Sequence, residues 1–152
     1  MSLTEKITLK LLNKLNPELA HNLVIKALSL KLSPSITSYS APSLNINVSG
    51  LNLENPIGLA AGFDKNAEAI DSLSKLGFGF LEIGGVTPLP QDGNPKPRLF
   101  RLQKDKAIIN RFGFNNKGMK VIRSKLENSL SKIPVGVNLG ANKDSKNRID
   151  DY

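Results

Sequence analysis

The sequence predicts a parallel α/β fold that follows a short helical extension. Three apolar segments that look like buried strands, over 57–61, 78–86 and 134–139, alternate with helical periodicity over 66–76 and 116–132. This alternation is typical of a parallel sheet, because each helix supplies the crossover between neighbouring strands. With 152 residues, 39% of them apolar and 22% charged, the chain is long enough to bury a core.

Residues 1–32 are expected to form a helical hairpin of two amphipathic helices. Apolar residues recur at helical spacing, and lysines spaced by four residues line the other face of the first helix. Asn16-Pro17-Glu18 predicts the start of the second helix, with an amide N-cap, a proline at the first position and an acid in the first turn. The pair is either docked on the rest of the protein, which the pattern alone favours, or a membrane-surface anchor.

A serine- and proline-rich stretch over 33–43 predicts a linker, which divides the chain into regions 1–43 and 44–152. Residues 44–53 alternate around Ser49-Gly50, so a small β-hairpin is expected there.

The remaining elements belong to the predicted sheet and its connections. The helix over 66–76 should stop at Gly77. The proline-rich stretch 87–114 predicts a long ordered loop with one short strand over 99–102, and the polar tail 140–152 predicts another loop. Three strands and two helices do not close a sheet, so the chain is expected to be part of a larger one.

In a parallel α/β barrel, functional residues gather at the carboxyl ends of the strands. The first predicted strand ends at 60–65, where small residues let the backbone approach a flat ligand and Lys65 offers a cation. The second ends at 84–87. The third ends at 138–140, where Asn138 can bind a heterocycle edge. The alternatives are a tight turn with a solvated lysine and an asparagine that only holds a loop.

Two further features concern polar residues. The segment 110–116, NRFGFNN, places amide and guanidinium donors between aromatic rings, which suits a planar anion. Its simplest alternative is a loop with Asn115 or Asn116 as a helix N-cap. Glu82 lies inside an apolar strand and is expected to meet a cation or amide donors, in a structural role more than a catalytic one.

Several classes of site lack support in the sequence. There is no cysteine, no metal-ligand cluster and no phosphate-binding glycine motif, and the single histidine, His21, lies far from the strand ends. The net charge of +8 would attract a polyanion, but aromatic residues are not interleaved with the basic ones, so no nucleic-acid partner is expected. No apolar run approaches the ~20 residues of a membrane span.

Four motifs in this order resemble dihydroorotate dehydrogenases: NPIGLAAGFDKNAE at 55–68, GFGFLEIGGVTPLPQDGNPKPRLFRL at 77–102, INRFGFNN at 109–116 and GVNLGANKD at 136–144. LNPELAH at 15–21 looks like the membrane-associating extension of the quinone-linked class 2 enzymes. The resemblance implies an FMN-binding (β/α)₈ TIM barrel, of which only about the first three strands and two helices are present. It also implies oxidation of dihydroorotate to orotate in pyrimidine (UMP) biosynthesis, with FMN as hydride acceptor and a ubiquinone-type membrane quinone as final acceptor.

The resemblance also assigns roles by position. The residues implied to contact FMN are Ala61, Gly62, Phe63, Asp64, Lys65, Gly85 and Asn138. Those implied to bind the substrate are Lys65, Asn110, Arg111, Phe112, Gly113 and Phe114. His21 and Arg101 match positions near the quinone tunnel, and no metal is implied.

The chain departs from the family pattern at Gly85, where members usually carry Thr or Ser against the flavin. The family's serine base and phosphate-binding loops lie beyond Tyr152, so residues 1–152 alone are expected to hold FMN poorly and to be inactive. The resemblance favours the membrane-anchor interpretation of 1–32, on the cytoplasmic face of the inner or cell membrane of a bacterium. The alternatives are a non-catalytic membrane-binding fragment and a flavin barrel like the tRNA-dihydrouridine synthases.

Overall fold

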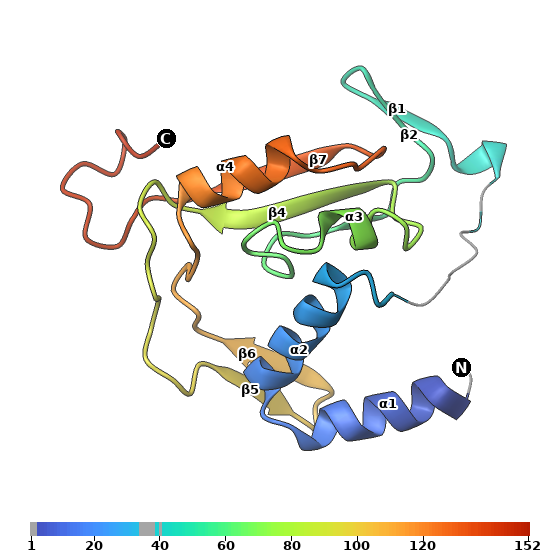
Figure 1. Cartoon of the computed structure of the whole chain (residues 1–152), viewed down its shortest axis with the longest axis horizontal. Helices are drawn as coiled ribbons and strands as arrows, with labels where there is room; N and C mark the ends of the chain where they lie inside the picture. The colour runs from blue at the N-terminus through green and yellow to red at the C-terminus, as the bar shows by residue number, and fades with distance from the viewer. Residues whose placement is uncertain (1–2, 34–38, 40) are drawn as a thin grey trace.

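A parallel sheet lies at the centre of the computed structural model, which describes residues 3–33, 39 and 41–152. The strands are β3 (Gly58–Leu59), β4 (Phe80–Val86) and β7 (Val135–Leu139), in the order β3-β4-β7 with every pairing parallel. The predicted parallel α/β arrangement is confirmed (Figure 1). The middle strand β4 is the longest. β3 pairs with its first two residues and β7 with Leu81 to Val86, and the chain that follows β3 reaches the carboxyl end of β4 at the Gly62–Gly84 bond.

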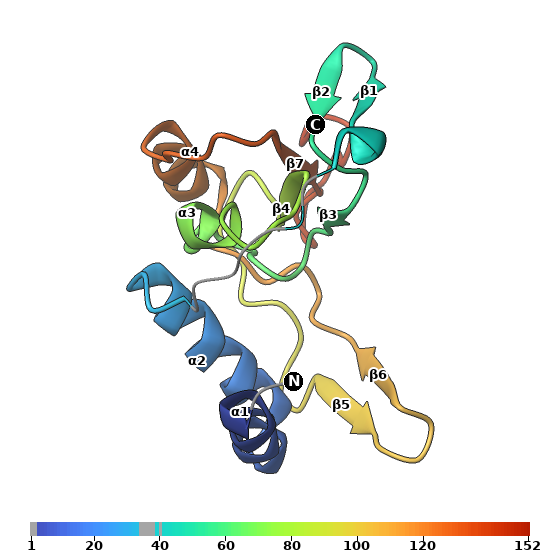
Figure 2. The same cartoon turned by 90° about the vertical axis from the view of Figure 1, so that its right-hand side faces the viewer.

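Two helices, α3 (Ile70–Leu73) and α4 (Met119–Glu127), cover the same face of this sheet (Figure 2). Leu81 and Ile83 from β4 and Ile122 from α4 are each only 1% exposed and form the centre of the core. Ile25 and Leu28 from α2 (Pro17–Ser29) join the same cluster. The helical extension therefore contributes to the core of the sheet region.

The predicted helix over 66–76 is much shorter in the structure. The segment before α3 is bent because the Asp64 carboxylate accepts hydrogen bonds from the Glu68 and Ala69 amides, at 2.8 and 2.7 Å. Ala67 has a φ of 55°, which a helix does not accommodate. After α3 the chain continues as turns before Gly77, where φ is 86°.

The second predicted helix, over 116–132, is likewise shortened to α4. Its N-cap is Gly118, with φ 80° and ψ 159°, so neither Asn115 nor Asn116 caps it. Asn116 instead binds Thr87 and the Phe114 carbonyl. Beyond Glu127 the chain reaches β7 through Asn128 and a turn.

The two N-terminal helices are present, but they do not form a side-by-side hairpin. α1 (Leu3–Lys14) and α2 meet in an L, as both views show (Figures 1 and 2). The predicted start of α2 is confirmed, since the Asn16 side chain accepts hydrogen bonds from the Glu18 and Leu19 amides at 3.0 and 3.2 Å. α2 docks on the core, and α1 extends away from it.

Two antiparallel hairpins complete the fold. β1 (Ile46–Val48) and β2 (Leu51–Leu53) form the predicted hairpin, with positive φ at Ser49 and Gly50. β5 (Leu99–Leu102) pairs with β6 (Ala107–Asn110), a strand that was expected to be loop.

The predicted linker 33–43 falls largely outside the described residues. Within the described part of the chain, no helix is long and apolar enough to cross a membrane. The tail 140–152 contains neither helix nor strand, as predicted.

Candidate functional site

A cavity of about 560 Å³ opens at the carboxyl ends of the three parallel strands. This strand-end cavity is within the usual size range of small-molecule sites, about 300–1,000 Å³. The residues lining it are Ala61, Gly62, Lys65, Gly84, Gly85, Asn94, Asn110, Arg111, Phe112, Gly113, Phe114, Asn115 and Asn138. The structure thus brings together residues from all three strand ends and the segment that follows β6.

The strand ends are joined to one another by backbone hydrogen bonds. The Gly62 amide donates to the Gly84 carbonyl at 2.8 Å, and the Gly140 amide donates to the Val86 carbonyl at 2.8 Å. A Cβ added at Gly84 or Gly85 would come within 3 Å of neighbouring protein atoms, so neither position has room for a side chain, whereas a Cβ at Gly62 would meet nothing within 4 Å. These glycines therefore present only backbone to the cavity that they line. A flat ligand can therefore lie against backbone at this edge.

Lys65 is the cation at one side of the cavity. Its ammonium donates to the Gly62 carbonyl at 2.7 Å and lies 4.3 Å from the centre of the Phe112 ring. Burial lowers the pKa of Lys65 from its ordinary value, and the Glu18 carboxylate opposes that shift. A partly desolvated ammonium fixed between a carbonyl and a ring is suited to an anionic ligand.

Residues 110–115, which we call the 110–115 wall, form the part of the cavity lining that includes Phe112, the ring that Lys65 contacts. Gln91 donates to the carbonyls of Gly113 and Phe114, each at 3.2 Å. The Asn116 amide group donates to the Phe114 carbonyl at 2.7 Å and to the Thr87 hydroxyl at 2.9 Å. The wall is therefore fastened to the end of β4 through buried polar groups.

One buried atom of the wall has no partner among the described residues. Asn115 Oδ1 is inaccessible to solvent and accepts no hydrogen bond. Buried polar atoms are rarely left without a partner, because desolvation without a compensating bond is costly. An unsatisfied acceptor, a backbone surface without side chains and a fixed cation all fit a bound heterocyclic ligand such as a flavin.

The other predicted cofactor residues lie just outside this cavity. Phe63 and Asp64 line a neighbouring space of about 50 Å³ together with His21, Lys65 and Asn115. Asp64 is only 2% exposed, and its carboxylate is already bound to two backbone amides. Its position favours a structural role behind the site.

His21 and Arg101, the two predicted quinone-tunnel residues, come from α2 and β5. The His21 ring stands edge-on to Phe63 at 5.2 Å, so His21 lies beside the end of β3 and the expectation that it is far from the strand ends is wrong, because α2 docks against the turn that follows β3. Burial, with the nearby Lys65 charge, lowers the pKa of His21. Arg101 donates to the carbonyls of Asn13 and Leu15 at the end of α1, at 3.3 and 2.8 Å.

Glu82 meets an amide donor, as expected for a carboxylate inside a strand. Asn138 Nδ2 donates to Glu82 Oε1 at 3.3 Å. This bond orients the Asn138 side chain, which lines the cavity.

Sequence reasoning missed Arg98 and Asn94. Arg98 is 7% exposed and pairs with Glu18, 80 positions earlier, at 2.7 Å. Asn94 lines the cavity and donates to the Arg111 carbonyl at 2.7 Å. Both lie in a proline-rich stretch whose only sequence signal was irregular structure.

Replacing Gly85 with serine is expected to displace the Phe114 ring. A Cβ at this position would lie 2.7 Å from Phe114 Cδ1 and 3.2 Å from Asn138 Oδ1. Because Phe114 is exposed and its ring can rotate away, the free energy of unfolding should change by less than about 1.5 kcal/mol. Aromatic NMR resonances of Phe114 should shift in Gly85→Ser but not in Gly136→Ser, where a Cβ makes ordinary contacts. An unchanged Phe114 resonance would contradict the expected displacement.

The Glu18–Arg98 pair predicts loss of stability in acid. The hydrogen bond from Arg98 holds the pKa of Glu18 below its ordinary value, although burial acts in the opposite direction. In the unfolded chain Glu18 regains its ordinary pKa, so between the two pKa values the unfolded state binds more protons. The stabilisation from the lowered pKa of Glu18 is fully present above the ordinary pKa of the unfolded chain. It is lost as the pH falls through the lower pKa of the folded chain.

We therefore expect the free energy of unfolding to fall more steeply in the unsubstituted chain than in Glu18→Gln between about pH 5 and pH 3. Urea titrations at several pH values measure both slopes. Equal slopes would show that the pKa of Glu18 is not lowered in the folded state.

Comparisons with known proteins identify the family of this chain. Residues 43–152 match the family profile described as dihydroorotate dehydrogenase. A dihydroorotate dehydrogenase (quinone) of Rhodopseudomonas palustris (strain BisA53) is 54% identical over 149 residues, covering 97% of this chain and 41% of that protein. One of Rhizobium meliloti (strain 1021) is 56% identical over 137 residues, covering 90% of this chain and 38% of that protein. The chain thus spans about two fifths of the length of these relatives.

Solved structures agree with this result. The crystal structure of DHODH from Eimeria tenella in complex with ferulenol matches with a TM-score of 0.83 and 49% identity, over 89% of this chain and 38% of that one. The ligand-free type from the same organism gives a TM-score of 0.82 and 49% identity, over 89% and 40% of the two chains. The aligned residues therefore share the fold of these structures.

Proposed function

Because the chain belongs to the dihydroorotate dehydrogenase family, we propose that a protein carrying it oxidises dihydroorotate to orotate in pyrimidine (UMP) biosynthesis, with FMN as hydride acceptor and a membrane quinone as final electron acceptor. The observation that carries this proposal is the strand-end cavity, which combines a fixed cation, a glycine surface and a wall rich in amides. The tRNA-dihydrouridine synthase alternative is not favoured, since the relatives have the dehydrogenase name.

In this proposal the glycine surface and its neighbours hold FMN. Ala61, Gly62 and Gly85 offer backbone, Asn138 offers an amide, and Lys65 offers a positive charge. FMN, when bound, supplies the acceptor for the hydride that leaves the substrate. Lys65 would compensate negative charge that develops at the flavin, and its short bond to the Gly62 carbonyl keeps it in place.

The 110–115 wall binds the substrate in the proposal. Asn110 and the backbone around Gly113 would present donors to the substrate carboxylate and ring carbonyls, and Phe112 and Phe114 would contact its ring. Arg111, whose Nε and Nη2 donate to the Pro97 carbonyl at 3.4 and 3.1 Å, would add positive charge to the wall.

We also propose that residues 44–152 form the first part of a larger (β/α)₈ barrel and that residues 1–43 form a separate extension. The family match over 43–152 supports this division.

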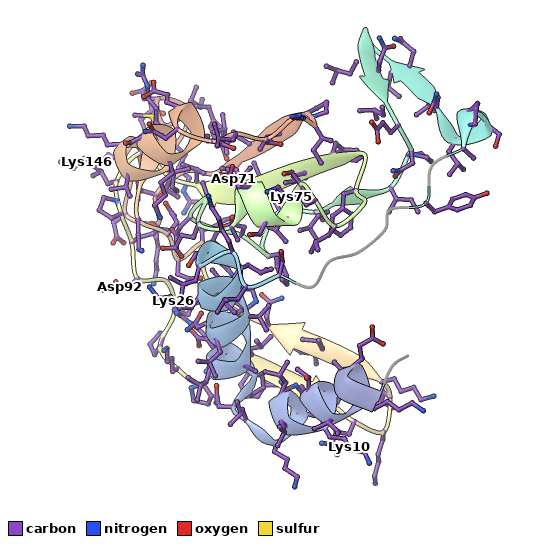
Figure 3. The ribbon with its side chains drawn as sticks, turned by 45° about the vertical axis from the view of Figure 1, so that its right-hand side comes forward. Lys10, Lys26, Asp71, Lys75, Asp92 and Lys146 are labelled. Carbon is purple, nitrogen blue, oxygen red and sulfur yellow. The ribbon has the colours of Figure 1, made fainter. Side chains whose placement is uncertain are left out.

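Membrane association through α1 and α2 is also proposed, on the cytoplasmic face of the inner or cell membrane in a bacterium. Apolar side chains of both helices are exposed, including Ile7, Leu11, Leu19 and Leu23. Lysines such as Lys10 extend from the outer side of α1 (Figure 3). Exposed leucines beside lysines suit an anionic membrane surface. Arg101 joins the β5–β6 hairpin to the end of α1, and His21 projects from α2 toward Phe63; we propose that the quinone passage lies along α2 between these two residues.

A grafted protein tests the proposed reaction. Residues 1–152 replace the matching part of the Rhodopseudomonas palustris relative, and quinone reduction is followed with dihydroorotate or with dihydrouracil, which lacks the carboxylate. We expect turnover with dihydroorotate and at least about 100-fold lower kcat/KM with dihydrouracil. Comparable rates with both substrates, or a folded graft without turnover, would refute the proposal.

A further inference from the structure

The 110–115 wall rests on a neighbouring loop of the chain as well as on the sheet. The Asn94 amide donates to the Phe112 carbonyl at 2.9 Å, and the Arg111 amide donates to the Arg98 carbonyl at 2.9 Å. Asn94 Nδ2 adds a bond to the Arg111 carbonyl at 2.7 Å. We call residues 92–98 the 92–98 loop. Because the 92–98 loop is hydrogen-bonded to the 110–115 wall, the position of the loop fixes that of the wall segment over 111–112.

Arg98 fastens this loop to α2. Its Nη2 donates to Glu18 Oε1 at 2.7 Å, and its Nε lies 3.2 Å from each carboxylate oxygen of Glu18. Its Nη1 donates to the carbonyls of Asp92 and Asn94 at 2.6 and 3.0 Å. One guanidinium thus binds a helix and the loop at the same time, a geometry that the single ammonium of a lysine cannot reproduce.

The ion pair is buried and lies behind Phe112. Glu18 and Arg98 are 8% and 7% exposed, and the Arg98 guanidinium lies 5.4 Å from the centre of the Phe112 ring. Lys65 contacts the same ring at 4.3 Å. The second cation near Glu18 is Lys96, at 3.5 Å, and it is largely exposed. The Phe112 ring therefore contacts both Lys65, which lines the cavity, and Arg98, which Glu18 of α2 positions.

We propose that Glu18 and Arg98 are positioning residues for the substrate wall, so that α2 is part of the substrate site. The inference rests on the proposed function in taking the 110–115 wall to be the part that binds dihydroorotate. Glu18 touches no ligand in this account. It acts by holding Arg98, which fixes the 92–98 loop and, through that loop, the wall.

Hydrogen exchange on the purified chain tests the positioning directly and requires no ligand. In Glu18→Gln, exchange of the Asn94 and Arg111 amides should accelerate roughly tenfold or more, because the wall opens locally. Exchange of the Gly62 and Gly140 amides, which join the strand ends, should stay unchanged. Arg98→Lys keeps the positive charge but loses the planar guanidinium that binds Glu18 and the loop together. It should accelerate exchange of the Asn94 and Arg111 amides as Glu18→Gln does.

The matched control is Glu127→Gln, which breaks the exposed pair between Glu127 and Arg123 on α4. It should leave exchange at Asn94 and Arg111 unchanged. Equal acceleration at the wall and at the strand ends in Glu18→Gln would mean that the pair serves general stability only, and would overturn the proposal. Unchanged exchange at the wall would overturn it too.

In the grafted protein, the same Glu18→Gln change should raise KM for dihydroorotate roughly tenfold while kcat changes less than about twofold. An equal loss in kcat with KM unchanged would contradict a positioning role. Failure of the proposed function is distinguishable, because it appears as no turnover in the graft without substitutions, whereas the exchange measurement still reports on the ion pair.

Discussion

Alanine at Lys65 is expected to lower kcat/KM of the grafted protein for dihydroorotate by about 100- to 1,000-fold. The ammonium is the cation held at the junction of the glycine surface and the wall, by the Gly62 carbonyl and the Phe112 ring. Removing it deletes the charge that faces both proposed ligands in a partly water-excluded site, where electrostatic interactions are strong. Steady-state kinetics with dihydroorotate and quinone measure the loss.

Lys75→Ala is the matched control for this prediction. Lys75 is exposed at the end of α3, away from the cavity lining (Figure 3). It should keep kcat/KM within about twofold of the unsubstituted graft. If Lys65→Ala loses no more activity than Lys75→Ala, the cavity does not use its cation and the proposed site is wrong.

Alanine at Asp64 is expected to lower the free energy of unfolding of the chain by about 2–4 kcal/mol. The Asp64 carboxylate accepts the amides of Glu68 and Ala69 at 2.8 and 2.7 Å, and Ala69 is fully buried. Without the carboxylate, two backbone donors beside the core lose their acceptors. The loss is large compared with the 5–15 kcal/mol that usually stabilises a domain.

Urea denaturation measures this effect, and two variants define it. Asp64→Asn retains one acceptor and should lose about half as much stability. Asp92→Ala changes an exposed carboxylate on the 92–98 loop and should stay within about 0.5 kcal/mol of the unsubstituted chain (Figure 3). An Asp64→Ala chain as stable as Asp92→Ala would show that the turn before α3 does not depend on this carboxylate.

Local sequence patterns correctly predicted the helices, strands and turns that depend on interactions between residues close together in the sequence. Asn16 and Pro17 predicted the start of α2, and the Asn16 side chain caps that helix. Ser49-Gly50 predicted the turn between β1 and β2, and both residues have positive φ in the structure. The parallel sheet followed from apolar segments spaced by helical ones, because a parallel pair requires a crossover.

The missed features depend on contacts between residues that are distant in sequence. β6 was overlooked because Ile108 and Ile109 follow a charged turn and stay exposed, so no burial pattern marked the strand. The helix before Gly77 is shorter than predicted because Ala67 has a φ of 55°, outside the helical region, within the turn whose Glu68 and Ala69 amides bind the Asp64 carboxylate. Arg98 is 80 positions from Glu18, and no single-sequence pattern pairs them.

The candidate site likewise combines residues that the sequence predicted with residues whose roles depend on contacts between distant parts of the chain. The small residues at 61–62 and the donors at 110–114 were visible in the sequence, and the structure places them around one cavity. Asn94 was not visible, because its contribution arises only when the 92–98 loop lies against Arg111. The helical extension also contributes more to the site region than its pattern indicated, since Glu18 reaches the loop that supports the wall.

Anaerobic flavin reduction in the grafted protein tests the central claim most directly, namely that the strand-end cavity receives dihydroorotate beside FMN. We expect the graft to contain bound flavin, whose visible absorbance is bleached by dihydroorotate and restored by quinone. The same bleaching should be at least about 100-fold slower in Lys65→Ala. A folded graft whose flavin stays oxidised with dihydroorotate, or is bleached equally fast without the Lys65 ammonium, would contradict this account.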